Sequence, residues 1–353
     1  MSVNLSSYID YSEWSNDWKR FIEFFLRVEG IKSKDELWTK MDFLIREYDP
    51  HLWGSYRKGD MSDISYEEHN FQLAYLLRYY ALYSKTIEHI ATRSNFLEEI
   101  LSRSQGKYKP NVEESFSDQY YVSIFGGGSA PEALSIIRSI ADGNLINEDI
   151  GLPSSDVFER KKYGIYFSIF DKHRWETGRS FTKHFIKREI DRHNQGQNFL
   201  HAFFNEKKFN IESIDNLSFR HQQDLIIFQF SLTEFRDLIG DQSLLEKIHK
   251  ISNNLSPSGK LLLIERNHNS TPWSFFETFE KLTNFNLQAY DQINHEAQSL
   301  NEIPRFIKKI YQREGRHVSR YNKFVFYLYG REKTNFENEP KEKEDKYPYR
   351  KFF

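Results

Sequence analysis

Apolar residues in the first hundred positions recur at intervals of three and four, which is the spacing of one face of an α-helix. A first helix is predicted by Trp14, Trp18, Phe21, Ile22, Phe25 and Leu26. A capping box at Ser33 and Glu36 precedes a second stripe over residues 37–48. A similar pattern at Ser65 and Glu68 precedes a third, longer helix over residues 73–87, and residues 51–59 between them predict a glycine-punctuated loop. We therefore expect a helical region over residues 1–115.

From about residue 118 the pattern changes to short apolar runs that alternate with helical stripes, as in a parallel sheet with crossover helices. Six strands are predicted at residues 121–125, 164–170, 224–230, 260–265, 286–292 and 323–328. A further strand falls at residues 198–204 or at 209–214, and the pattern leaves both open. The predicted fold is α/β, with a doubly wound sheet over residues 116–333. Residues 141–163 lack periodicity and predict an insertion, and the charged residues 334–353 predict a disordered tail.

The amino-acid composition excludes several kinds of catalytic and metal-binding site. The 353 residues include no cysteine, which excludes disulfides, thiolate zinc sites and cysteine nucleophiles. The 12 histidines show no metal-binding helical spacing, so no metal is expected. The longest apolar runs fall far short of the roughly 18 residues of a membrane helix, and an acidic start argues against a signal peptide. We expect no membrane span and a cytoplasmic location. Aromatic residues make up 16% of the chain, so rings must form much of the core.

A glycine turn follows the first predicted strand and leads into a helix. Gly126, Gly127 and Gly128 permit backbone angles and a close ligand approach that a Cβ atom would block, and Pro131 suits the first turn of the helix. The second predicted strand ends in Asp171, where a carboxylate can accept hydrogen bonds from both hydroxyls of a ribose. Together these features predict a nucleotide-like ligand at the carboxyl edge of the sheet.

Over residues 118–330 these motifs resemble the class I S-adenosylmethionine-dependent methyltransferases. The resemblance implies a seven-stranded Rossmann-like methyltransferase sheet behind the N-terminal helical region. It also implies that Gly126, Gly127 and Gly128 contact the methionine part of S-adenosylmethionine and that Asp171 holds its ribose. More narrowly, residues 126–132 and the aromatic helix at 75–83 look like methyltransferases with a preceding helical region, among them ribosomal-RNA-methylating and mitochondrial-ribosome-associated groups.

The same resemblance assigns further residues to the cofactor and the transfer site. Phe230 is implied as a cofactor contact, with Ser231 beside it at the transfer site. For the residue that faces adenine, Asn205 and Asp215 compete, and the sequence does not choose between them. Methyl transfer depends mainly on alignment and on exclusion of water, so catalytic residues are hard to recognise. The candidates are Ser231 and Glu234.

The sequence also departs from the pattern of the family. Ile124 stands where the first strand usually carries an acid, and Glu132 at the helix start is placed to compensate. A nicotinamide-dependent dehydrogenase has the same arrangement of strand, glycine turn and acidic residue. Two features count against it: Pro131 replaces the third glycine, and Asp171 lies much further along the chain than the roughly 20 positions expected.

The sequence does not identify the methyl acceptor. The segment from Arg305 to Lys323 carries seven basic residues and one acid, with Tyr311 and Tyr321 available for stacking, which predicts RNA as a partner. The lack of an Asn-Pro-Pro-Tyr-like motif leaves an oxygen, a ring nitrogen or a carboxylate as the methylated group. The predicted function is S-adenosylmethionine-dependent methyl transfer, with RNA as one acceptor. The alternatives are a small-molecule methyltransferase, with the helical region as its lid, and a catalytically inactive cofactor-binding assembly factor.

Overall fold

The computed structural model describes residues 14–58, 65–103, 118–142, 163–194, 200–266, 273–283, 285–299 and 301–331. The predicted tail lies outside these residues, as does almost all of the predicted insertion. Within the described ranges, none of the helices has both the length and the apolar content needed to cross a bilayer.

Helices precede the first strand, as the sequence predicts. Ser33 caps the second of them by accepting a 3.1 Å hydrogen bond from the Glu36 backbone N–H, whereas the Glu36 carboxylate accepts from the Lys32 backbone N–H at 2.7 Å and not from that of Ser33. Its continuation is a π-helix, and a second π-helix follows α4. The elements are α1 (Asn16–Val28), α2 (Lys34–Phe43), η2 (Leu44–Tyr48), α3 (Asp49–Lys58), α4 (His69–Tyr75), η3 (Leu76–Tyr80), α5 (Ala81–Tyr83), α6 (Thr86–Ser94) and α7 (Phe96–Arg103).

Two predictions for this region were wrong. The loop predicted at residues 51–59 is helix α3 as far as Lys58, because burial of Leu52 offsets the cost of about 1 kcal/mol for Gly54 within a helix. The third helix is not continuous, since η3 interrupts it and a turn at residues 84–85 separates α5 from α6. A π-helix turn carries an additional residue, and a hydrophobic stripe does not reveal it.

Seven strands form one mixed sheet in the order β3-β2-β1-β4-β5-β7-β6. The strands β1 to β5 are parallel to one another, and β7 runs antiparallel between β5 and β6. Their bounds are β1 (Asp118–Phe125), β2 (Tyr163–Asp171), β3 (Leu200–Lys208), β4 (Gln223–Gln229), β5 (Leu255–Arg266), β6 (Asn286–Glu296) and β7 (Tyr321–Gly330). This is a seven-stranded Rossmann-like sheet, and the predicted α/β fold class is confirmed. The third strand matches the first of the two predicted positions, and the second position contains the 3-10 helix η4 (Ile211–Asn216).

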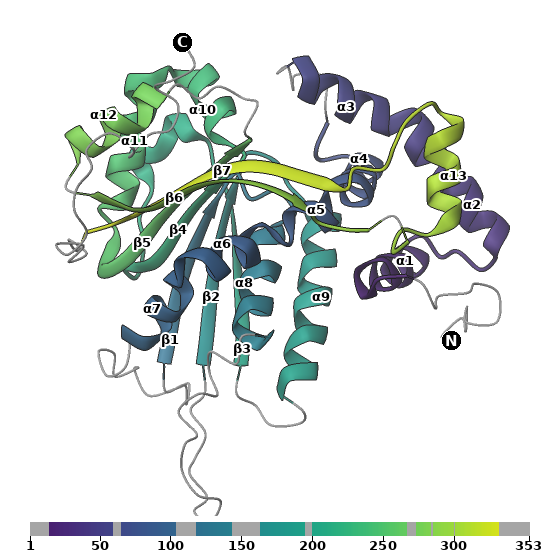
Figure 1. Ribbon diagram of the computed structural model, residues 1–353, viewed down its shortest axis with the longest axis horizontal. Coiled ribbons are helices and arrows are strands. Elements are labelled where there is room, and N and C mark those ends of the chain that lie inside the picture. The colour runs from purple at the N-terminus through teal and green to yellow at the C-terminus, as the bar shows by residue number, and fades with distance from the viewer. Residues whose placement is uncertain are drawn as a thin grey trace, which may run out of the picture.

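Helices cover both faces of the sheet (Figure 1). One face packs against α8 (Pro131–Asp142), α9 (Glu176–Asn194) and the N-terminal helices, and the other against α10 (Leu232–Ile239), α11 (Asp241–Ser252) and α12 (Trp273–Leu282). Parallel strands with both faces buried need apolar side chains throughout. Aromatic rings supply many of them: the Phe125 ring stacks between Phe170 and Phe228, with centroids 4.6 and 4.9 Å away.

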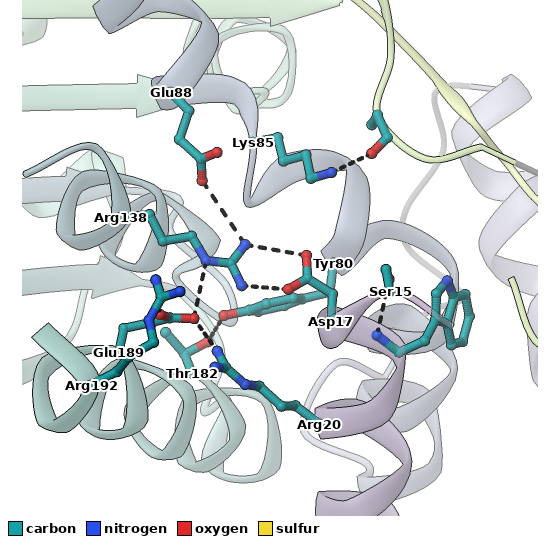
Figure 2. Close-up of polar contacts among 12 residues, drawn as sticks. Ser15, Asp17, Arg20, Tyr80, Lys85, Glu88, Arg138, Thr182, Glu189 and Arg192 are labelled. Carbon is teal, nitrogen blue, oxygen red and sulfur yellow. Dashed lines mark hydrogen bonds and ion pairs between the residues drawn. The ribbon is translucent and has the colours of Figure 1, made fainter. Parts of the chain in front are cut away.

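A buried network of charges joins the N-terminal helices to the sheet domain (Figure 2). Arg138 of α8 forms an ion pair with Asp17 of α1 and lies 3.6 Å from a carboxylate oxygen of Glu189 on α9. Arg20 of α1 pairs with the same glutamate, and the Tyr80 hydroxyl lies 2.8 Å from that of Thr182. Because an unpaired charge in this environment is costly, the ion pairs hold α1 against α8 and α9, and the Tyr80 hydroxyl joins η3 to α9.

Candidate functional site

A pocket opens at the carboxyl edge of the parallel strands, with about 750 Å³ of empty space, part of it open to solvent. The strand ends contribute the turn at residues 126–128, Asp171 and Phe230. The other side is formed by the N-terminal region, through Tyr66, Tyr75 and Tyr83. The sheet therefore provides one side of the pocket, and the N-terminal region provides the other.

The glycine turn lies at the floor of the pocket and is packed tightly against the protein. Gly126 has φ +66°, and a Cβ atom there would lie 2.5 Å from the Cβ of Ser231. A Cβ at Gly127 would lie 2.8 Å from a methyl group of Ile124. Gly128 has φ +48° and faces the Trp175 indole. The glycines are thus needed for the turn itself, and all three line the pocket, while their N–H groups donate to Phe170 and Asp171.

Asp171 ends β2 beside this turn, as predicted, and its carboxylate accepts three hydrogen bonds from the protein. One oxygen accepts from the Gly128 N–H at 2.8 Å. The other accepts from the His173 N–H at 2.8 Å and from the Trp175 indole N–H at 3.2 Å. A carboxylate has about four acceptor positions, so about one is left for a ligand. Asp171 therefore organises the turn in addition to facing the pocket.

Two buried polar side chains in the pocket are unsatisfied. Glu132, in the first turn of α8, is 2% exposed, and one of its carboxylate oxygens has no hydrogen-bond partner among the described residues. Gln229, at the end of β4, is 4% exposed, and neither its amide nitrogen nor its amide oxygen has a partner within the described ranges. Burial raises the pKa of Glu132 to about 8. Each unsatisfied group costs about 1 to 3 kcal/mol of folding free energy, and a ligand that forms hydrogen bonds with these groups would remove that cost.

The candidates after β4 differ in their surroundings. Phe230 lines the pocket with φ +55°, a left-handed conformation that is rare for a phenylalanine. The buried Ser231 hydroxyl donates a 3.3 Å hydrogen bond to the Phe125 carbonyl and so braces the glycine turn. Glu234 is exposed at the rim of the pocket. Of the two catalytic candidates, only Glu234 faces solvent.

Aromatic rings that the sequence analysis did not assign to the site line much of the pocket. The Trp175 ring lies 5.0 Å from Tyr66 and 4.9 Å from Tyr75, between centroids. Tyr83 lies 4.6 Å from Phe230. The aromatic pattern at residues 75–83 is the sequence signal for these rings. Which of its rings reach the pocket depends on the π-helix η3.

The two residues predicted to compete for the adenine contact lie in different parts of the fold. Asn205 lies within β3, paired in register with Ser168, and its side chain is exposed and does not line the pocket. The strand continues to Lys208, so Asn205 is not at its carboxyl end. Phe209 follows the strand and lines the pocket instead. Asp215 belongs to η4, and its side chain lies outside the described part of the chain.

The basic segment from Arg305 to Lys323 is compensated in part by acids from elsewhere in the chain. It contains α13 (Arg305–Arg313), which lies beside α2 (Figure 1). Three of its arginines form ion pairs: Arg313 with Asp42, Arg316 with Asp49 at 3.3 Å and Arg320 with Glu296 at 3.3 Å. The excess of positive charge along the sequence is therefore reduced in space at these three arginines.

No group of three or more histidine, aspartate or glutamate side chains in the described ranges is arranged to hold a metal ion. The chain matches no known family model and no curated protein. Similar solved structures include the bifunctional kinase-methyltransferase WbdD, at 10% identity over 71% of this chain and 41% of that protein, with a TM-score of 0.37. The chain therefore spans less than half of WbdD.

Two other solved structures resemble the chain over most of their own length. Precorrin-6y C5,15-methyltransferase from Geobacter metallireducens GS-15 is 13% identical over 68% of this chain and 87% of that one, with a TM-score of 0.34. An S-adenosylmethionine-dependent methyltransferase from Clostridium acetobutylicum ATCC 824 is 10% identical over 79% and 96%, with a TM-score of 0.36. These likenesses are too distant to carry an argument about activity, and the fold assignment rests on the strand order.

Proposed function

We propose that the chain binds S-adenosylmethionine in this pocket and transfers its methyl group to an acceptor. The observation that carries the proposal is the unsatisfied carboxyl of Glu132 beside the glycine turn. S-adenosylmethionine carries an ammonium and a sulfonium, and a buried carboxylate is the natural counter-ion for such a ligand. The Gln229 amide can donate a hydrogen bond to the carboxylate of the same molecule. The residues present therefore fit this cofactor.

The other residues of the pocket have complementary roles. The turn at 126–128 allows a close backbone approach, and Asp171 retains about one acceptor position for a ribose hydroxyl. When bound, the cofactor supplies an electrophilic methyl group on sulfur. Tyr75, Tyr83 and Phe230 would exclude water from that position and limit where an acceptor can lie. Glu234, at the rim, is placed to accept a proton from an acceptor that carries one.

The ion pairs of the basic segment favour a small-molecule acceptor over RNA. Arg313, Arg316 and Arg320 each have a carboxylate partner within the protein, so neutralising them would disturb the fold as well as any phosphate contact. The N-terminal helices, which form one side of the pocket, fit the interpretation of this region as a lid.

Two measurements test the proposal. Calorimetry should show binding of S-adenosylmethionine and S-adenosylhomocysteine and no comparable binding of a nicotinamide dinucleotide; the reverse would favour the dehydrogenase interpretation. A radiolabelled-methyl assay on separated RNA, protein and metabolite fractions should then place label in the metabolites. Label in RNA would restore that acceptor, and tight cofactor binding without transfer to any fraction would support the inactive assembly factor.

A further inference from the structure

One wall of the pocket consists of aromatic rings that come from both parts of the chain. We call Tyr75, Tyr83 and Phe230 the aromatic wall. Tyr83 of α5 lies 4.6 Å from Phe230, which follows β4, and 6.4 Å from Tyr75 of α4, measured between ring centroids. All three line the pocket. A surface of this kind binds flat ring systems well, because offset and edge-to-face ring contacts add to the burial of area.

A positive charge lies against this wall. Arg266 is the last residue of β5, the strand next to β4. Its guanidinium carbon is 5.7 Å from the centre of the Phe230 ring and 5.8 Å from that of Tyr83, and it donates a hydrogen bond to the Tyr83 hydroxyl. The guanidinium is therefore held in position by the rings that would contact an acceptor.

Apart from Glu234 at the rim, the oxygens next to the transfer position are already engaged within the protein. The Ser231 hydroxyl is engaged with a backbone carbonyl, and Asp171 already accepts three hydrogen bonds. Glu234 is exposed at the rim. An acceptor that arrives already ionised needs no base, and a nearby arginine favours the ionised form.

We propose that the acceptor is a small planar aromatic molecule with an anionic oxygen, either an aryl carboxylate or a phenolate, whose ring packs on the aromatic wall and whose oxygen lies near Arg266. This inference rests on the proposed function. A lone pair of the oxygen attacks the methyl carbon, the carbon–sulfur bond breaks, and its electron pair stays on sulfur. The products are a neutral methyl ester or methyl ether and S-adenosylhomocysteine, with no proton left to place.

The test compares three probes on protein loaded with S-adenosylhomocysteine, by ligand-observed NMR titration. Benzoate has both the ring and the charge, cyclohexanecarboxylate has the charge without the planar ring, and benzamide has the ring without the charge. We expect benzoate to bind roughly three- to tenfold more tightly than cyclohexanecarboxylate. Its advantage over benzamide should be about tenfold or more.

Variants assign these preferences to residues. Arg266→Met should weaken benzoate binding about ten- to a hundredfold and leave benzamide binding unchanged, and Arg266→Lys should retain part of the effect. Tyr83→Leu should remove the preference for the planar ring, whereas Tyr83→Phe should keep it. An unchanged circular dichroism spectrum and an unfolding midpoint close to that of the parent show that each variant is folded.

The outcomes separate this inference from the proposed function. If the parent protein does not bind S-adenosylhomocysteine, the proposed function fails, and the inference fails with it. If S-adenosylhomocysteine binds but benzoate and cyclohexanecarboxylate bind equally, only the inference is overturned. Equal affinity of benzoate for the parent and for folded Arg266→Met would overturn it as well, as would transfer of methyl label to RNA.

Discussion

The buried Glu132 carboxyl makes a sharp prediction about how cofactor affinity depends on pH. Because burial raises its pKa to about 8, the carboxyl is about nine-tenths protonated at pH 7 in the unliganded protein. The ammonium group of the ligand needs the carboxylate as its partner, so binding must release up to about 0.9 proton at that pH. Affinity for S-adenosylhomocysteine should therefore rise close to tenfold for each pH unit between about 5.5 and 7.

The folded protein alone has the opposite dependence on pH. The pKa of Glu132 is raised above its ordinary value of 4.5, so the protonated form contributes stability that is complete below pH 4.5 and is lost as the pH rises through about 8. Glu132→Gln keeps the shape without the ionisation. Its stability relative to the parent should therefore increase by a few kcal/mol between pH 5 and pH 8.

Calorimetry in buffers of different ionisation enthalpy measures the released proton directly. Glu132→Gln should bind S-adenosylhomocysteine about 10 to 150 times more weakly than the parent at pH 8, with a nearly flat pH dependence and no proton release. Glu98→Gln, on the exposed side of α7, is the matched control and should behave as the parent does. The reasoning is refuted if Glu132→Gln keeps the steep dependence, because His173 or another pocket group would then be responsible.

Two further predictions concern stability and are measured by urea unfolding. Gly126→Ala should cost about 2 to 5 kcal/mol, because it adds a close contact to the strain of a positive φ, whereas Gly30→Ala, with φ +64° and no atom within 4 Å of its Cβ position, should cost about 1 to 2 kcal/mol. Equal costs would show that the turn relaxes freely. Asp49→Asn should cost about 3 to 5 kcal/mol, because it leaves the buried guanidinium of Arg78 without its 2.6 Å partner, whereas Glu47→Gln at an exposed ion pair should cost under about 1 kcal/mol. A small effect of Asp49→Asn would mean that water reaches this pair.

Local patterns in the sequence were enough for the fold and for one half of the site. Alternation between apolar runs and helical stripes predicts the strands, because each strand of a parallel sheet must be apolar over its length. The turn at 126–128 and Asp171 then come together without further information, since parallel strands end at the same edge of a sheet. Helix boundaries were predicted less well than strands. Ser33 caps α2 as expected, whereas α3 continues through a segment in which glycine had indicated a loop.

Tertiary structure decided the other half of the site. Tyr75 and Tyr83 reach the pocket because η3 inserts a π-turn between them and because Tyr80 of η3 packs on α9 through Phe181 and Thr182. It also decided which charges meet, since Arg316 lies 3.3 Å from Asp49, which is far from it along the chain and also pairs with Arg78. Periodicity records which face of an element is buried. It carries no record of the distant residue that meets that face, so ion pairs, the aromatic wall and the raised pKa of Glu132 emerge only when the chain is folded.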